Sequence, residues 1–215
     1  MRDADPAAPG AAADCRDFTD MTDSTDLRQE LAAAAARLVA DGGLDYASAK
    51  KKAVRQVLGN AHLPKGSLPD NDAIDAALLE HLELFDAEHA PRVAQRRRTA
   101  AVLMQRLEAF RPYLTGAVWK GIVAEHAPIH LQLFHDNPKD VEIQLLNDGV
   151  DFEVSTVPHF RGGSEVEALS FYVGETPVLV SLYDEVDLRG ALKAGSNGAQ
   201  RGDRRAVLER LESAA

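Results

Sequence analysis

The hydrophobic period of the sequence changes at Arg111–Pro112, and this change limits the folds open to the chain. Before it, apolar residues recur every three to four positions, as on one face of an amphipathic helix. After it, short apolar runs are separated by Gly, Pro and charged residues, which is typical of strands. Helices followed by a strand-rich half predict an α+β fold, with an N-terminal helical region followed by a small mixed β-sheet.

The expected elements follow from this pattern. Helices are expected over residues 24–41, 45–58, 70–85 and 89–110. Strands are expected over residues 117–123, 129–134, 150–157, 166–173 and 176–184, with helices over 137–149 and 203–215. These elements divide the chain into a disordered acidic tail (1–24), a helical region (25–111) and an α+β domain (112–215).

Charge and cysteine content limit the classes of partner and the setting. The 215-residue chain has a formal net charge of −10, and residues 1–26 carry half of it through seven aspartates and two arginines. This Ala-, Pro- and Asp-rich start predicts disorder, and Met21, which follows it, is a candidate natural start. A single cysteine, Cys15, favours a reducing, cytoplasmic setting. No apolar run approaches the roughly 18 residues of a membrane span, so no membrane partner is expected.

The stretch "LTGAVWKGIVAEHAPIHLQLF", Leu114 to Phe134, resembles the signature of polymerase-beta-type nucleotidyltransferases. In that signature, Gly-Ser ends a strand and a D-x-D pair follows about ten residues later. Leu114, Gly116 and Gly121 match the leading Leu and the two glycines without a gap. The resemblance implies a nucleotidyltransferase-like topology, in which the glycines and nearby amides hold a phosphate. It makes Gly116, Lys120, Gly121 and His130 the candidate ligand-binding residues.

The catalytic groups of that signature are replaced in this chain. Ala117 stands at the serine, Pro128 at the first aspartate and His130 at the second. Two-metal catalysis also needs a third carboxylate on a neighbouring strand, and none precedes Asp184 in the last expected strand. The replacements predict a catalytically degenerate protein that acts as a binding or regulatory module for a nucleotide or a protein partner. No cofactor is expected, with Mg²⁺ or a nucleotide as the alternative.

A second resemblance is to uncharacterised bacterial proteins, some of which carry the label UDP-N-acetylmuramate–alanine ligase. The shared segments are "AARL", "DYASAKKKA" and "LQLFHD". The chain has no G-x-x-x-x-G-K-[ST] loop to hold ATP, and it is too short for the three domains of such ligases. The sequence does not support the label.

Two other interpretations remain open. One is an active nucleotidyltransferase in which His130, Asp136 and Asp184 replace the usual metal ligands. The other is a nucleic-acid-binding adaptor whose basic helices contact phosphates. It would use Lys50, Lys51, Lys52, Arg96, Arg97 and Arg98. A metal site at the histidine cluster is less favoured, because His130 and His135 would point to opposite faces of a strand. For Trp119, packing against an adjacent helix is favoured over a ligand contact.

Overall fold

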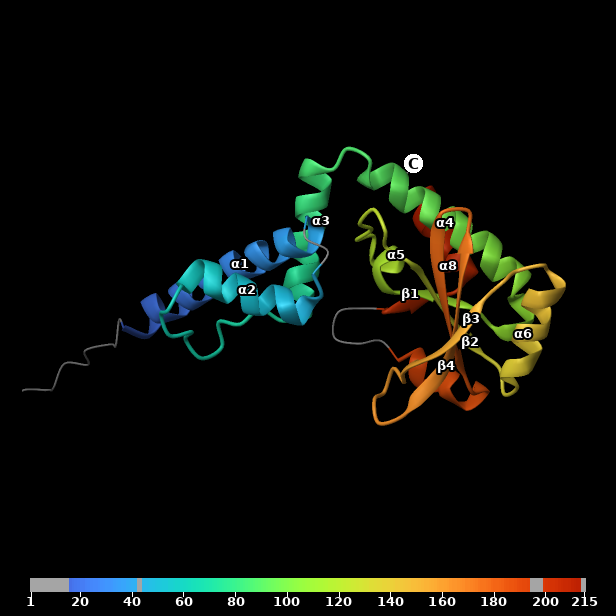
Figure 1. The fold of residues 1–215 in the computed structure, drawn as a ribbon. Coiled ribbons are helices and arrows are strands. Elements are labelled where there is room, and N and C mark those ends of the chain that lie inside the picture. Colours follow the sequence, from blue (N-terminus) through green and yellow to red (C-terminus); the bar gives the residue numbers. More distant parts are fainter. Residues whose placement is uncertain (1–15, 42–43, 194–198, 214–215) are drawn as a thin grey trace, which may run out of the picture. The chain divides into compact units, whose positions relative to one another are not determined.

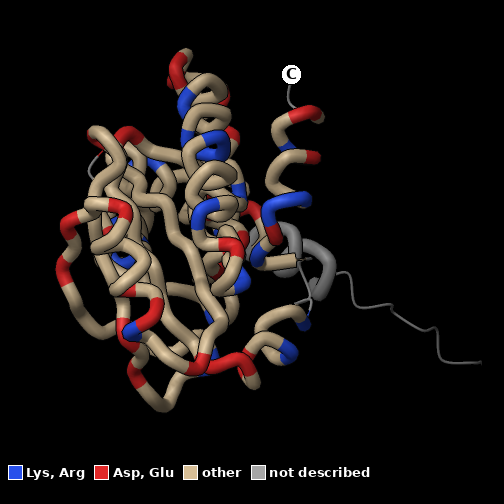
Figure 2. Tube along the Cα trace, turned by 90° about the vertical axis from the view of Figure 1, so that its right-hand side faces the viewer, with Lys and Arg blue, Asp and Glu red and all other residues tan. Residues whose placement is uncertain are grey.

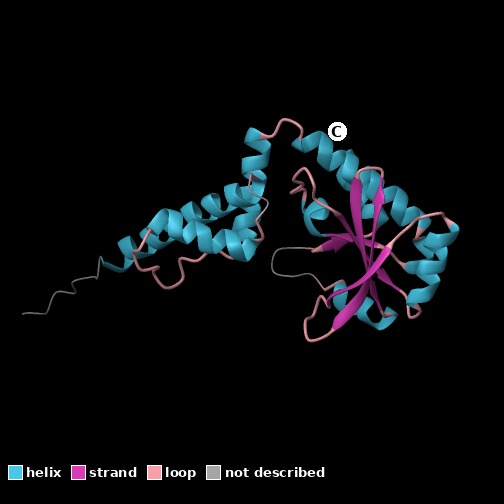
Figure 3. Ribbon diagram, in the orientation of Figure 1, coloured by secondary structure: helices cyan, strands magenta, loops and turns pink. Residues whose placement is uncertain are grey.

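The computed structural model describes residues 16–41, 44–193 and 199–213, with side chains from Thr25 onward (Figures 1 and 3). The chain divides into two compact units, Met1–Leu78 and Leu79–Ala215. Most of the expected disordered tail, residues 1–15, lies outside the described residues. Helix α1 (Arg16–Ala40) includes residues 16–24, which the sequence assigned to the tail. Extending an existing helix costs much less than nucleating one, so a packed helix can continue into such a segment.

The first unit is a small helical cluster. Helix α1 packs along α2 (Tyr46–Leu58), and the first turns of α3 (Asn71–Phe85) close the core. The buried residues are mostly small, and they are Leu31, Ala32, Ala35, Ala49, Ala53 and Ile74. Asp45 caps α2 by accepting hydrogen bonds from the backbone N–H groups of Ala47 and Ser48. Alanines at the contact let two helices approach closely, so a short pair of helices can bury a continuous apolar surface.

The second unit is a mixed six-stranded sheet with helices packed on it. The strands lie in the order β3-β4-β5-β2-β1-β6. Their bounds are β1 Tyr113–Thr115, β2 Ile129–Phe134, β3 Glu153–Pro158, β4 Glu165–Val173, β5 Thr176–Tyr183 and β6 Arg201–Gly202. The helices are α4 His89–Arg106, α5 Gly116–Lys120, α6 Pro138–Asn147, α7 Leu188–Ala191 and α8 Arg204–Glu212, with 3-10 turns η1 Glu108–Phe110 and η2 Glu185–Asp187. The α+β prediction is confirmed at this level.

Helices cover the two faces of the sheet to different extents. One face, the helix-covered face, carries the buried side chains of Leu131, Val180 and Leu169, which pack in one cluster with residues of α4, α6 and α8. The opposite face, the open face, is covered at one end, where Phe134 and Tyr183 pack with Ala191 of α7. Only β2 and β5 pair in parallel, and the other strand pairs are antiparallel.

Two sequence expectations differ from the structure. The segment 117–123 was expected as a strand, but residues 116–120 form the short helix α5. A strand there would need a ladder of backbone partners, and this segment instead receives hydrogen bonds from arginine side chains, as described below. The units also divide at Leu78/Leu79 rather than at 111/112. The reason is that α4 places Val93, Ala100 and Met104 in the core of the sheet unit.

Trp119 closes the packing between α5, β6 and α8. Its indole Nε1–H donates to the Ala199 carbonyl at 2.7 Å, and the Arg210 guanidinium lies 3.8 Å from the ring centroid. A Cβ added at Gly202 would lie 2.2 Å from Trp119 Cζ3. The expectation that Trp119 packs against a helix agrees with this contact to α8.

We expect Gly202→Ala to destabilise the protein by roughly 1–3 kcal/mol, because the buried indole cannot move aside without strain. Gly190→Ala is the matched control. The three atoms nearest its Cβ belong to the Arg161 side chain, which is half exposed and can turn into solvent at the cost of its ion pair with Asp187, so it should lower the free energy of unfolding by less than about 1 kcal/mol. Urea unfolding followed by circular dichroism measures both. Equal effects of the two substitutions would contradict the role given to Trp119.

Candidate functional site

The motif glycine and the motif histidine are brought together in the structure. Gly116 follows β1 with φ of +70°, in the left-handed region that favours glycine. Its strand neighbour Thr115 pairs with His130 on β2. A Cβ at position 116 would lie 3.3 Å from His130 Nδ1. The imidazole therefore packs against the backbone of the loop that, by the resemblance, would approach a phosphate.

The other motif positions close the turn around α5. The Ala117 carbonyl accepts hydrogen bonds from the N–H groups of Gly121 and Ile122, and Gly121 has φ of +82°. Lys120 is exposed at the end of α5, and Pro128 directly precedes β2. Ala117 and Pro128 supply no side-chain oxygen where the resemblance expects a serine and a carboxylate.

Arginines of α4 donate hydrogen bonds to α5 and to the segment between α5 and β2. Arg97 is 8% exposed and donates to the Val118 and Trp119 carbonyls, each at 3.2 Å. Arg96 donates to the Glu125 carbonyl at 3.0 Å and to the Thr176 hydroxyl. Burial lowers the pKa of the Arg97 guanidinium, and the nearby positive charge of Arg210 lowers it further. The guanidinium stays protonated nonetheless, so two residues proposed for phosphate contacts are used inside the fold.

The remaining candidate phosphate ligands are Arg98 on α4 and three lysines on α2. Arg98 is exposed, as are Lys51 and Lys52, whereas Lys50 Nζ donates to Asn71 Oδ1 at 2.9 Å. Figure 2 shows that Lys and Arg positions are interspersed with Asp and Glu positions along the chain. Arg96–Arg98 therefore do not form a continuous basic surface along α4, because only Arg98 is exposed.

Around His130, the open face carries polar and apolar side chains in rows across the strands. One row runs through the paired residues Thr115, His130, Leu179 and Ser170. The next row runs through Gln132, Ser181 and Ala168. The strand neighbours of His130 are thus Thr115 and Leu179, and neither is a carboxylate. Burial lowers the pKa of His130, so the imidazole is held toward its neutral form.

Arg201 brings positive charge to the same face. Its guanidinium donates to Gln132 Oε1 and lies 4.9 Å from the centroid of the Phe160 ring. Burial lowers its pKa, and Arg201 Nε is buried with no hydrogen-bond partner among the described residues. Burial also raises the pKa of the nearby Tyr183 phenol. The sequence did not identify this group, because Arg201 lies in an expected loop; the shared face of His130 and Gln132 on an expected strand indicated a polar row but not its arginine partner.

His159 is not available as a base. Its Nδ1 accepts from the Arg161 backbone N–H at 3.0 Å, so Nε2 must carry the proton that is shared with Asp187 Oδ2 at 3.2 Å. Arg161 also pairs with Asp187 at 3.1 Å. This arrangement fixes the turn beside η2 and leaves the ring nitrogens of His159 occupied.

The alternative metal ligands are not brought together. His130 is near the start of β2, whereas Asp136 follows its end and Asp184 follows the end of the parallel strand β5. Six residues of extended chain separate His130 from Asp136 by roughly 20 Å. Asp136 instead accepts from the Glu185 backbone N–H at 2.9 Å. Among the described residues, no three His, Cys, Asp or Glu side chains gather in a metal-binding group.

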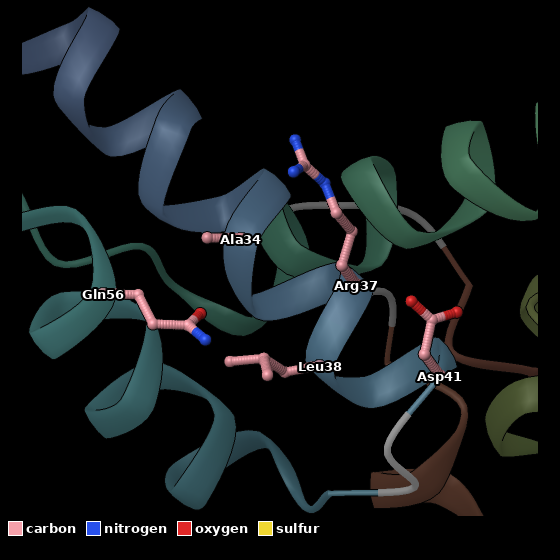
Figure 4. A pocket seen from close by; sticks show the side chains of 5 residues that line it. All are labelled: Ala34, Arg37, Leu38, Asp41 and Gln56. Atoms are coloured by element: carbon pink, nitrogen blue, oxygen red, sulfur yellow. The ribbon is translucent and has the colours of Figure 1, made fainter.

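Two surface hollows lined by described residues lie away from the motif. One, of about 360 Å³, belongs to the first unit and is lined by Ala34, Arg37, Leu38, Asp41 and Gln56 (Figure 4). Another, of about 430 Å³, is lined by residues at the ends of β3, β4 and β5, including Phe152, Tyr172 and Pro177. Neither contains Gly116, Lys120, Gly121 or His130, so the candidate ligand-binding residues do not line these two hollows.

Comparison with family models and with curated proteins gives no match to this chain. Within the described ranges, no helix has the length and apolar character needed to cross a membrane.

We expect Arg97→Met to destabilise the protein by about 2–3 kcal/mol, because it removes two hydrogen bonds from a charged donor to buried carbonyls. Arg98→Met, one residue along α4 and exposed, is the control and should stay within about 0.5 kcal/mol of the parent. Chemical unfolding of both variants measures the difference. A small effect at Arg97 would show that solvent replaces the guanidinium at these carbonyls.

We expect His130 to make the protein less stable in mild acid. Its folded-state pKa lies below the usual value of 6.5, so between these two values the unfolded chain binds more protons. Stability should therefore fall as the pH drops below 6.5. Thermal unfolding between pH 7.5 and pH 5 should show a flatter profile for His130→Asn than for the parent. His126→Asn, at an exposed position, should leave the slope unchanged, and parallel profiles for all three proteins would contradict the prediction.

Proposed function

We propose that the second unit is a nucleotidyltransferase-like domain that has lost transfer chemistry and serves as a binding module. The observation that carries the proposal is the local geometry of the motif. Gly116 lies against His130 across the β1–β2 pair, as the resemblance expects of the loop and the second motif aspartate. The chain keeps this arrangement with an imidazole in place of the carboxylate.

Loss of catalysis follows from the side chains at these positions. Two-metal phosphoryl transfer needs anionic oxygens that hold divalent cations on one face of a sheet. The motif positions hold Ala117, Pro128 and His130, and the adjacent strand presents Leu179 opposite His130. A neutral imidazole cannot replace the negative charge of two carboxylates, so the module binds a ligand without activating it.

The open face favours an anionic ligand with hydrogen-bonding edges. Arg201 supplies positive charge there, and Gln132, Ser170 and Ser181 can donate or accept hydrogen bonds. Nucleotide phosphates suit a guanidinium, which forms charge-assisted hydrogen bonds with phosphate oxygens. We therefore propose a nucleotide as the ligand, held without Mg²⁺ and without turnover.

Thermal shift with each of the four ribonucleoside triphosphates tests the proposal. A ligand that binds only the folded state raises the melting temperature by mass action. We expect a concentration-dependent rise that is the same in Mg²⁺ and in EDTA, is lost in Arg201→Ala and is kept in Arg98→Ala. Arg201→Ala must itself retain a cooperative transition. A melting temperature that no nucleotide changes would overturn the nucleotide assignment.

A transfer assay tests the loss of catalysis. With radiolabelled nucleoside triphosphates and Mg²⁺, we expect no label on the protein, on added RNA or on added protein substrates. Label transfer that requires His130, shown by its loss in His130→Ala, would overturn the non-catalytic assignment.

A further inference from the structure

The outer strand β3 leaves one edge of the sheet uncovered. It pairs with β4 on one side and has no strand on its other side among the described residues. Five of its six residues are exposed. An edge strand presents unpaired backbone N–H and C=O groups, and natural proteins usually protect such edges with charged side chains, prolines, bulges or a covering segment. Here the strand is "EVSTVP", with Glu153 as its single charge and Pro158 at its end.

Exposed apolar side chains lie beside this edge, on the helix-covered face. Val154 is 55% exposed and shares its face with its strand partner Leu169, which packs in the core with Leu145 of α6. On α6, Ile143 is 55% and Leu146 is 61% exposed. Single exposed apolar residues are ordinary, but several on adjacent elements mark an interaction surface.

The flank of α6 that carries Leu146 is turned toward β3, whereas Ile143 lies on the side of α6 opposite the buried Val141 and Leu145. Burial and the neighbouring Glu142 carboxyl raise the pKa of Glu167 on β4, so Glu142, one turn before Leu146, lies beside Glu167. Glu167 is in turn the strand partner of Thr156 on β3. Residues four apart lie on the same side of a helix, so Leu146 extends from α6 over the same edge as Val154. The uncovered strand and the apolar flank of α6 therefore form one continuous surface, which we call the β3–α6 edge.

We infer that the β3–α6 edge binds a second copy of this chain through a two-fold axis perpendicular to the sheet. Antiparallel pairing of β3 with itself would continue the sheet across the axis and keep the helices of both copies on one face. Such an interface uses the same patch on both subunits. It would bring Val154 and Leu146 of each copy toward their counterparts on β3 and α6 of the other.

The sequence of β3 suits this self-pairing. Two-fold symmetry with equivalent faces requires a register centred on one residue, and the middle of this six-residue strand offers Ser155 or Thr156. Centring on Thr156 would set Val154 opposite Pro158, which has no N–H to donate, so we place Ser155 opposite Ser155 of the second copy. Val154 then faces Thr156, and Glu153 faces Val157. No like charges stand opposite each other, and opposed side chains in antiparallel strands interact directly. A basic peptide would find only one negative charge to pair with on this strand, that of Glu153.

Sedimentation velocity of the full chain at several concentrations tests the inference. We expect a dimer that Val154→Lys converts to monomer, because the lysine would carry charge into the pairing face on both copies. Leu146→Glu should have the same effect through the helix. Val186→Lys, at a residue 78% exposed on η2, is the control and should leave the dimer intact. A parent that sediments as a monomer up to about 100 μM, near the upper range of weak specific association, would overturn the inference, as would a dimer that persists in the edge variants.

A disulfide trap fixes the register. In a chain with Cys15→Ser, Ser155→Cys places the thiols of the two copies opposite each other. Cross-strand Cβ atoms lie roughly 4.5–5.5 Å apart, and the short end of this range meets the roughly 3.5–4.5 Å of disulfides. Mild oxidation should give a covalent dimer on a non-reducing gel, while Val186→Cys under the same conditions should not. A dimer in solution that Ser155→Cys does not trap would overturn the register, and equal trapping at both positions would point to random collision.

Discussion

A buried guanidinium organises the sheet unit. Arg97 comes from α4, and its hydrogen bonds end on the Val118 and Trp119 carbonyls of α5. A charge removed from water is tolerated only when polar groups surround it, and these carbonyls are the groups that the last turn of a short helix leaves without intrahelical partners. The guanidinium and the carbonyls therefore satisfy each other's hydrogen-bonding needs. Arg92 and Arg96 repeat the arrangement at the Val123 and Glu125 carbonyls, so one helix face holds the irregular segment that leads into β2.

This interaction explains why the sequence was informative about most of the fold and misleading about α5. Helical and strand periods depend on local alternation of apolar residues, and they identified α6, α8 and the strands β2 to β5 near their observed bounds. The run "AVWKGIV" also has the composition of a strand, and Val118, Trp119 and Val123 are buried as a strand would require. What decides its conformation is a set of donors some twenty residues earlier on α4. A pattern read over a short window cannot contain such a partner, and Arg96 and Arg97 were instead considered as phosphate contacts of a basic helix.

The candidate site, like the fold, was predictable from the sequence only in part. Gly116 and His130, which the motif singled out, meet across β1 and β2. Of the three residues considered as metal ligands, His130 is set apart from Asp136 and Asp184 by the length of the strand. Arg201 reaches the open face from a two-residue strand at the far edge of the sheet, and such a short element leaves no periodic signal. Side chains joined by sheet pairing over long sequence distances are the part that a single sequence does not specify.

The position of Trp119 also makes the chain its own spectroscopic reporter. It is the only tryptophan of the protein, it is 4% exposed, and it belongs to the second unit. Its emission therefore follows the environment between α5, β6 and α8, while far-ultraviolet ellipticity follows the helices of both units. If the helical cluster and the sheet unit open at different denaturant concentrations, the two signals will separate, because two-state behaviour requires different probes to coincide. The cooperativity between the two units can thus be measured without a label.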